Sequence, residues 1–363
     1  MLIYDLTMSY KELDGGAEVK LDLSIPSGVP EQLSRKVPLL VYFHGGGMCV
    51  GDRTSWLPHW LKDRILAADI AFLSAEYRLI PPSTGHNVVE DIQDLFRFIS
   101  SDVNVKLDAS HSATKINPEV IAVAGSSAGG FCAYLAAVHV TPKPKVLLSM
   151  YGMGGDFLTP YYLMPKQEVF FRGRELLNPR DFRQFLYPEC LKLPPISASA
   201  LAYHPVTSPT PGYPANPRMQ LPRLYLQMGT YLDYYTGSFE PSLSGILRPQ
   251  VASKKEHSEN EETRDIISAD QIPEKHRSLF PQLNISKSWP PTLLVHGSLD
   301  SAVHVHESRY LSRLLAHAGV KVELRVVNGE EHSFDYTEEA QTKYGQTGGL
   351  YDDILEFLLQ HLT

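Results

Sequence analysis

Residues 120–130 read VIAVAGSSAGG, and residues 131–140 continue as FCAYLAAVHV. A short apolar run, a glycine-rich turn and a helical segment, in that order, predict a buried strand that reverses directly into a helix. Gly125 and Gly129 flank the turn, where any side chain would collide with crowded backbone. Ser127 lies at the apex of this Gly-x-Ser-x-Gly pattern, so we expect its hydroxyl to project from the carboxyl end of a sheet as a nucleophile.

The same residues have a simpler explanation, which is a glycine-rich turn that carries two surface serines. Three fixed positions within five residues arise often by chance, and a motif needs its structural context before it carries weight. Here the apolar run before the turn and the helical segment after it supply that context, and a surface turn leaves them unexplained. Ser127 is therefore the candidate nucleophile, and Ser126 is its neighbour.

The composition indicates a globular chain with an acidic balance. Its 363 residues are 43% hydrophobic, which is sufficient for one large domain or two ordinary ones with a sizeable core. The formal net charge of −8 argues against nucleic acid or an anionic membrane surface as a partner. Small neutral or mixed substrates remain compatible with this charge.

The cysteine content and the lengths of the apolar runs indicate the cellular location that we expect for this protein. Cys49, Cys132 and Cys190 are too few and too scattered for a disulfide framework, and no pair has the spacing of metal ligands. The first residues show no basic start followed by a long apolar run, and no stretch of about 18 apolar residues suggests a membrane span. We expect a cytoplasmic protein with reduced thiols, no metal and no cofactor.

A second glycine-rich turn follows another predicted buried strand. Residues 37–43 read VPLLVYF, and His44 then precedes three consecutive glycines. Such a run costs backbone entropy, so it indicates close approach or positive φ. Backbone N–H groups at this position can stabilise the oxyanion that forms when an acyl carbon is attacked. We expect Gly46 and Gly47 to donate, together with the N–H of Ala128 directly after the nucleophile; a plain tight turn is the alternative.

Strand and helix patterns alternate through most of the chain. Strands are predicted at 70–74, 120–124, 145–150, 292–295 and 322–327, and helices at 88–99, 131–140, 304–317 and 350–362. This alternation predicts a mostly parallel sheet with helices on both faces, whose ligands bind beyond the carboxyl ends of the strands. We expect residues 31–150 and 290–363 to form this α/β core, and residues 18–24 to form an edge strand.

The alternation stops between residues 151 and 289, a segment with most of the 27 prolines and more than half of the 19 tyrosines. We expect short helices at 167–177 and 179–187, and a solvated loop or disordered link at the charged run 253–265. The tyrosines of this insertion could line a substrate pocket or only pack a small cap, and the sequence does not separate the two.

A serine hydroxyl needs a base to accept its proton, and an oriented imidazole serves best. His332 lies in a polar turn after the last predicted strand, at the same end of the sheet as Ser127. His44 is also at that end, but it belongs to the glycine turn, where a structural hydrogen bond is expected. Asp300 follows the preceding strand, and the order serine, acid, histidine is a known order of this triad. Glu331 is the alternative acid.

Together these residues resemble the hormone-sensitive-lipase-like α/β-hydrolases, carboxylesterases that carry an HGGG loop and a GDSAGG elbow. The similar segments are residues 44–47, 125–130, EYRL at 76–79, the pair at 90–91, HGSLD at 296–300 and EHSF at 331–334. The resemblance covers about residues 37–150 and 290–363. It implies an α/β-hydrolase fold whose mainly helical cap is formed by residues 1–30 and 151–289.

Two positions depart from this resemblance. Ser126 stands where these relatives carry an aspartate before the nucleophile. The YRL segment continues as Ile-Pro-Pro at 80–82, where the relatives tend to Ala-Pro-Glu. Neither change removes a catalytic group, but both alter polarity close to the site.

The leading hypothesis is a serine hydrolase that cleaves carboxylic esters through an acyl group on Ser127. The same triad could serve acyl transfer, lactone formation or carbon–carbon bond chemistry, because water and other acceptors attack the same acyl-enzyme. A ligand receptor is a third hypothesis, since related gibberellin receptors keep the fold but lose the histidine that His332 represents here. The expected partner is a small-molecule ester or acyl substrate, and a homodimer is compatible with the sequence.

Overall fold

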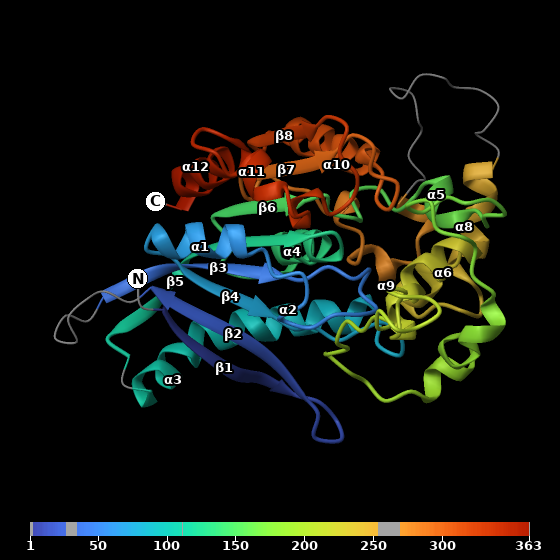
Figure 1. Cartoon of the computed structure of the whole chain (residues 1–363), viewed down its shortest axis with the longest axis horizontal. Coiled ribbons are helices and arrows are strands. Elements are labelled where there is room, and N and C mark those ends of the chain that lie inside the picture. The colour runs from blue at the N-terminus through green and yellow to red at the C-terminus, as the bar shows by residue number, and fades with distance from the viewer. Residues whose placement is uncertain (1–2, 27–34, 111, 253–268, 363) are drawn as a thin grey trace.

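The computed structural model describes residues 3–26, 35–110, 112–252 and 269–362, and these residues build a mostly parallel eight-stranded sheet (Figure 1). The strand order is β1-β2-β4-β3-β5-β6-β7-β8. The strands are β1 (Ile3–Glu12), β2 (Glu18–Pro26), β3 (Arg35–Phe43), β4 (Ala71–Ala75), β5 (Thr114–Ser126), β6 (Val146–Met150), β7 (Thr292–Gly297) and β8 (Val322–Val327). Only β2 runs antiparallel to both of its neighbours. The predicted α/β fold class is confirmed.

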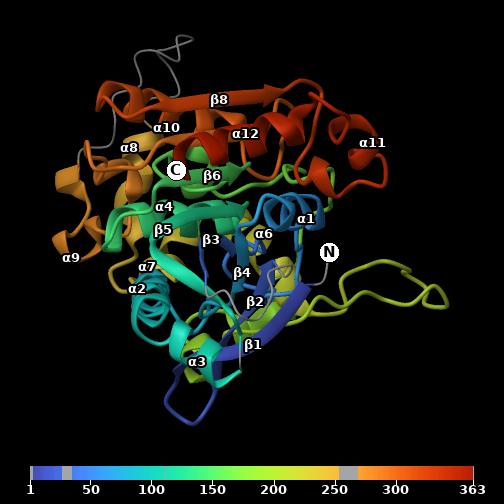
Figure 2. The same cartoon turned by 90° about the vertical axis from the view of Figure 1, so that its left-hand side faces the viewer.

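Helices cover both faces of the sheet (Figure 2). One face packs against α2 (Gly85–Ser101), α4 (Ala128–His139) and α10 (Val305–His317), and the other against α1 (His59–Ala67) and α12 (Leu350–Leu362). Alternate residues of β3 serve the two layers, because Val41 and Phe43 join the first core while Leu40 and Tyr42 join the second. A strand buried on both faces carries a nearly continuous apolar run, as residues 37–43 of β3 do.

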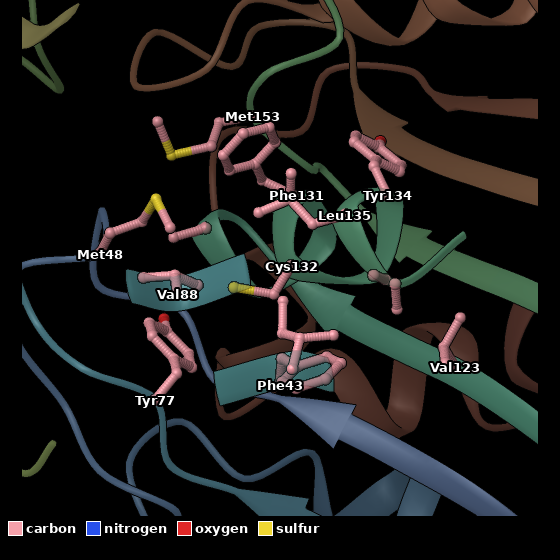
Figure 3. Packing of buried hydrophobic residues seen from close by; sticks show 14 of the residues in the cluster. Phe43, Met48, Tyr77, Val88, Val123, Phe131, Cys132, Tyr134, Leu135 and Met153 are labelled. Carbon is pink, nitrogen blue, oxygen red and sulfur yellow. The ribbon is translucent and has the colours of Figure 1, made fainter. Parts of the chain in front are cut away.

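The first core is packed from side chains of several elements (Figure 3). Phe43 of β3 and Val123 of β5 lie beneath Cys132 and Leu135 of α4, and all four are fully buried. Residues 103–109 continue after α2 as the short helix α3 (Val103–Ala109), whose buried side chains extend the same layer. The core therefore supports the strand ends that carry the glycine turn and the serine turn.

The N-terminal residues differ from expectation. Residues 18–24 were expected at the sheet edge and residues 1–30 in the cap, yet β2 is paired with β1 on one side and β4 on the other. At this side of the sheet the edge strand is β1, and both strands extend the main sheet. The alternation of buried Val19, Leu21 and Leu23 shows that one face is covered, but it cannot reveal how many partners a strand has.

The segment between β6 and β7 forms a mainly helical cap, which gathers at the end toward which the arrows of β3 and β4 point in Figure 1. Its elements are α5 (Pro160–Leu163), η1 (Pro179–Phe185), η2 (Glu189–Lys192), η3 (Pro217–Gln220), α6 (Leu221–Met228), α7 (Tyr231–Thr236), α8 (Leu243–Ala252), η5 (Ala269–Gln271), α9 (Glu274–Arg277) and η6 (Pro281–Leu283). Near the C-terminus, η7 (Phe334–Tyr336) and α11 (Ala340–Tyr344) precede α12.

Two expectations for the cap had different outcomes. The helix at 179–187 is present as η1, a 3₁₀ helix over Pro179–Phe185. The prediction of a helix at 167–177 is wrong. Phe171 and Arg174 form an isolated bridge around Gly173, and Arg172 has a φ of 50°. A left-handed residue beside glycine makes a turn rather than a helix. The charged run 253–265 lies outside the described residues.

Buried charged groups attach the cap to the core. Arg218 is 7% exposed and donates to the carbonyl oxygens of Cys49 (3.1 Å), Ile80 (3.4 Å) and Pro81 (2.6 Å). Glu76 accepts from Ser197 Oγ of the cap at 2.9 Å as well as from Arg53 Nη1 at 2.6 Å. Hydrogen bonds of this kind offset the desolvation of the buried ions, so they join two parts that are distant in sequence.

Glu307 of α10 is a further attachment point. Its carboxylate is 2% exposed and accepts from the Tyr162 hydroxyl at 2.7 Å and from the Gly154 N–H at 2.5 Å. Burial raises the pKa of Glu307 to about 8. The folded protein therefore binds a proton more tightly at this site than the unfolded chain does.

We predict that the free energy of unfolding falls as pH rises between about 5 and 8, because a carboxyl group with a raised folded pKa loses its contribution as it ionises. Glu307→Gln removes the titration while keeping an acceptor for Tyr162. Denaturant unfolding of the wild type and of Glu307→Gln across this range is the measurement. Equal slopes of stability against pH in the two proteins would contradict the prediction.

Gly129 sets the distance between α4 and β3. A Cβ at this position would lie 1.9 Å from the carbonyl oxygen of Phe43, and one at Gly125 would lie 2.1 Å from the Gly129 carbonyl. Both obstacles are backbone atoms, which cannot rotate away as a flexible side chain can. The flanking glycines of the serine turn are thus required by packing, as expected from the sequence.

Gly129→Ala is expected to destabilise the fold by about 3 kcal/mol or more, because overpacking against rigid backbone forces α4 away from the sheet. Gly245→Ala is the matched control, since the nearest atom there is a side-chain oxygen, Ser242 Oγ, at 3.1 Å rather than backbone at 1.9 Å, and alanine favours a helix. The midpoints of urea unfolding measure both changes. Similar midpoints for the two variants would refute the packing argument.

Candidate active site

Ser127 lies in the tight turn between β5 and α4. Its φ of 54° and ψ of −119° lie outside the regions that ordinary side chains favour. The turn is held by the Ser127 N–H, which donates to the Met150 carbonyl at 2.9 Å, and by the Ser127 carbonyl, which accepts from the Met153 N–H at 3.1 Å. Strain of this kind at a half-buried serine is typical of a nucleophile held in place by its surroundings.

The structure brings the three predicted triad residues together from three strand ends. His332 Nε2 lies 3.0 Å from Ser127 Oγ, and His332 Nδ1 lies 2.7 Å from Asp300 Oδ2. Ser127 follows β5, Asp300 follows β7 and His332 follows β8. Both distances are within hydrogen-bonding range, so the imidazole can accept the serine proton while donating to the carboxylate.

Asp300 is held rigidly and kept ionised. Its Oδ1 accepts from the N–H groups of Ala302 (2.9 Å) and Val303 (2.8 Å), and it is 5% exposed. Burial acts to raise its pKa, but the charge of His332 and the hydrogen bonds from His296 and His332 outweigh burial and hold the pKa well below its usual range. The carboxylate therefore stabilises an imidazolium without accepting its proton.

His296 is a site residue that the sequence argument missed. It is fully buried at the end of β7, and its Nε2 lies 3.2 Å from Asp300 Oδ2 and 2.8 Å from the Val303 carbonyl oxygen. Its Nδ1 lies 2.7 Å from Ser308 Oγ of α10. The sequence feature that could have identified His296 is its position four residues before Asp300 in the HGSLD segment. Only the fold shows that its imidazole contacts the Asp300 carboxylate.

The structure does not place the alternative acid on the imidazole ring. Glu331 Oε1 accepts from the N–H groups of Ser301 (2.6 Å) and His332 (3.0 Å), so this carboxylate joins the two loops that carry the triad acid and base. Asp335, another nearby carboxylate, accepts from Trp60 Nε1 at 3.1 Å. Asp300 is the acid that faces Nδ1.

The glycine turn after β3 lies against the serine turn. A Cβ at Gly45 would lie 3.4 Å from Ser127 Cβ, and Gly46 and Gly47 have φ values of 99° and 58° and line the same cavity as Ser127. In the described part of the chain, the N–H groups of Gly46 and Gly47 donate to no protein acceptor. Ala128 begins α4, where the first N–H groups of a helix lack an intrahelical partner. These are the donors expected for an oxyanion.

His44 has a structural role in this turn. Its ring stacks on Tyr77 with centroids 4.5 Å apart, and its Nδ1 donates to the Gly45 carbonyl at 2.8 Å. Burial lowers the pKa of His44 to about 4, so the ring is neutral and fixes the glycine turn rather than taking part in proton transfer.

Ser126 occupies a buried polar cluster beneath the site. Its Oγ lies 2.8 Å from the Tyr42 hydroxyl, which in turn lies 3.1 Å from the Tyr336 hydroxyl. Tyr42 and Tyr336 both donate to the Trp56 carbonyl. The departure from the aspartate of the resembling family therefore places a neutral hydroxyl, hydrogen-bonded to Tyr42, beside Ser127.

A cavity of about 200 Å³ opens onto Ser127 and His332. Core loops and the cap both contribute to its wall, including Val50, Trp56 and Leu226. Four tyrosines that the sequence left ambiguous line it, and others such as Tyr225 and Tyr235 are buried in the cap instead. Arg172, Arg174 and Arg223 line it too. Both interpretations of the tyrosines thus apply, to different members of the set.

The comparisons with known proteins agree with this geometry. A family model described as the α/β-hydrolase fold matches residues 40–231, more than half of the chain. The chain belongs to the α/β-hydrolase fold family. A model of the prolyl oligopeptidase family also matches residues 250–363, the part with Asp300 and His332.

Within this α/β-hydrolase family, similarity extends to two kinds of relative. The chain is 26% identical to the non-reducing polyketide synthase ausA of Aspergillus calidoustus over 98% of its own length but only 14% of the synthase. It is 30% identical to probable carboxylesterase 1 of Arabidopsis thaliana over 38% of this chain and 43% of that one. The chain thus spans less than half of the length of either relative.

Solved structures show the same fold. A hyperthermophilic esterase from the archaeon Pyrobaculum calidifontis superposes with a TM-score of 0.56 at 17% identity, covering 100% of this chain and 84% of the esterase. Among the residues that the structure describes, no group of three or more histidine, cysteine, aspartate or glutamate side chains could hold a metal ion. No helix of the described ranges is long and apolar enough to cross a membrane.

Asp300→Asn is predicted to slow labelling of Ser127 by a fluorophosphonate probe by on the order of a thousandfold. The asparagine oxygen can still accept from Ala302 and Val303, but its N–H₂ group would face His332 Nδ1 and favour the tautomer that cannot accept the serine proton. Glu331→Gln is the matched control and should lose far less, because that carboxylate does not contact the ring in the structure. Equal losses would show that the acid has been misassigned.

Proposed function

We propose that this protein is a serine hydrolase that cleaves carboxylic esters through an acyl intermediate on Ser127. The observation that carries the proposal is the aligned array in which His332 lies 3.0 Å from Ser127 Oγ and 2.7 Å from Asp300. Nucleophile, base and orienting acid within hydrogen-bonding distance are the minimum for this chemistry. The similarity to carboxylesterases and esterases supports the same activity.

In this proposal, Ser127 Oγ attacks the ester carbonyl carbon as its proton passes to His332 Nε2. The carbonyl oxygen becomes an anion that the N–H groups of Gly46, Gly47 and Ala128 stabilise. Collapse of the tetrahedral intermediate expels the alcohol, which takes the proton from His332. Water then attacks the acyl-serine with His332 as base, and the acid is released from Ser127, which regains its proton.

Ser127→Ala is expected to lower the release of 4-nitrophenol from 4-nitrophenyl acetate and butyrate by more than about a thousandfold, because no acyl-enzyme can form. Circular dichroism should show an unchanged fold, since the alanine keeps the backbone of the turn. Ser126→Ala is the neighbouring control and should retain most of the activity. Turnover that persists in Ser127→Ala would refute the proposal.

A second candidate is transfer of an acyl group of polyketide type to an acceptor other than water. It is favoured by the alignment of almost the whole chain with a segment of polyketide synthases from Aspergillus calidoustus and Aspergillus terreus. An acyl-serine cannot itself distinguish water from another acceptor. Mass spectrometry of the products in ¹⁸O-labelled water separates the two candidates, because hydrolysis places the label in the released acid and transfer does not.

The receptor hypothesis fits less well, because His332 is present and in contact with both of its triad partners. A small-molecule ester or acyl substrate remains the proposed partner, and the cavity of about 200 Å³ that Ser127 lines is its proposed binding place. A cytoplasmic location and a homodimer stay predictions.

A further inference from the structure

Arg223 is a buried cation in the wall of the active-site cavity. It belongs to α6 (Leu221–Met228) and is only 5% exposed. The residue before it, Pro222, packs closely on the glycine turn, because a Cβ at Gly47 would lie 2.4 Å from the Pro222 ring. The position of α6 against this turn places Arg223 in the wall that Ser127 also lines.

The charge of Arg223 has no ionic partner within the described part of the chain. No carboxylate oxygen lies within 4.0 Å of its guanidinium there, and its side-chain hydrogen-bond partners are two neutral groups, Gln220 Oε1 at 3.3 Å and the Tyr213 hydroxyl. Glu175, an exposed carboxylate whose charge reaches Arg223, forms no ion pair with it. Burial lowers the pKa of Arg223, as expected for a cation that water solvates poorly.

Two other arginines of the same region differ from Arg223 in their partners. Arg218, which is equally buried, donates to three carbonyl oxygens and so has a structural role. Arg172 lines the cavity but has Glu331 Oε2 at 3.8 Å. Burying a charge without a partner is unfavourable unless a ligand completes the site.

Two neighbours make the surroundings of Arg223 suitable for an anion. Arg174 lines the same cavity from an exposed position, and its positive charge acts on Arg223. Gln220 is 8% exposed, and its Oε1 already accepts from Tyr213 at 3.1 Å and from Arg223, which leaves its N–H₂ group to donate. A guanidinium beside an amide donor matches the planar geometry of a carboxylate.

We propose that the cavity selects acyl substrates that carry a free carboxylate in addition to the reacting ester, and that Arg223 binds this carboxylate. The inference rests on the proposed function for the reaction, but its binding step does not require turnover. A neutral substrate of the same shape would leave the guanidinium buried and unpaired, so it would be bound less well. Arg223 is thereby a specificity residue that acts on a remote part of the substrate.

Two substrates of similar shape test this proposal, the 4-nitrophenyl monoester of adipic acid and the matching 4-nitrophenyl ester of adipic acid monoamide. Wild-type protein should show a higher kcat/KM for the acid than for the amide. In Arg223→Gln, the ratio of the two kcat/KM values should fall on the order of tenfold to hundredfold, mainly through KM. The ratio within one protein does not depend on how much of a variant is folded.

Conservative and charge-matched variants complete the experiment. Arg223→Lys should retain part of the preference, because it keeps the charge but loses the planar fork. Arg97→Gln removes the same charge from an exposed residue of α2, which is 72% exposed and paired with Asp94, and should leave the ratio unchanged. A ratio near one in wild type, or an unchanged ratio in Arg223→Gln, would overturn the proposal.

Binding measured without chemistry separates this inference from the proposed function. The affinity of the 4-nitrophenyl adipate monoester is measured by isothermal titration into the Ser127→Ala variant and into the double variant Ser127→Ala/Arg223→Gln. The affinity of the double variant should be lower on the order of tenfold or more. If neither ester is hydrolysed by wild type but this difference in binding is present, the proposed function fails and the inference stands. If wild type hydrolyses both esters but Arg223→Gln does not change the binding affinity, the proposed function stands and the inference about Arg223 fails.

Discussion

The close approach of α4 to the end of β3 is the constraint on which the site depends. Gly129 allows it, since a Cβ there would lie 1.9 Å from the Phe43 carbonyl oxygen. This contact brings the serine turn beside the glycine turn, so that Ser127, Gly46 and Gly47 line one cavity. The unusual φ of Ser127 is sustained because the packed layers around it cannot relax.

Hydrogen bonds fix the loops that surround the serine turn. Two backbone N–H groups and two imidazoles hold the Asp300 carboxylate, and Glu331 joins the Asp300 loop to the His332 loop. Each loop begins at the carboxyl end of a parallel strand, so the sheet sets their spacing. The geometry of the triad is therefore a property of strand register and loop bracing together, and does not arise from any one loop.

The cap uses similar residues for different purposes. Arg218 donates to three carbonyl oxygens and anchors the cap, whereas Arg223 lies five residues on, lines the cavity and, among the described residues, bonds to the neutral groups of Gln220 and Tyr213. The tyrosines of the cap also have two roles, since some line the cavity and others are buried in the packing of the cap. Residue type alone does not distinguish these roles, because desolvation and hydrogen bonding depend on neighbours that are distant in the chain.

The sequence by itself determined the α/β fold class, the serine and glycine turns, and the strand ends that carry Ser127, Asp300 and His332, because apolar periodicity and glycine demands are local. Only the tertiary structure decided that β1 rather than β2 lies at the sheet edge and that residues 167–177 are not helical. It also decided that Asp300 rather than Glu331 faces the imidazole, that His296 contacts Asp300 and that Arg223 lines the cavity. These depend on which side chains meet across the fold, and no local pattern encodes such contacts.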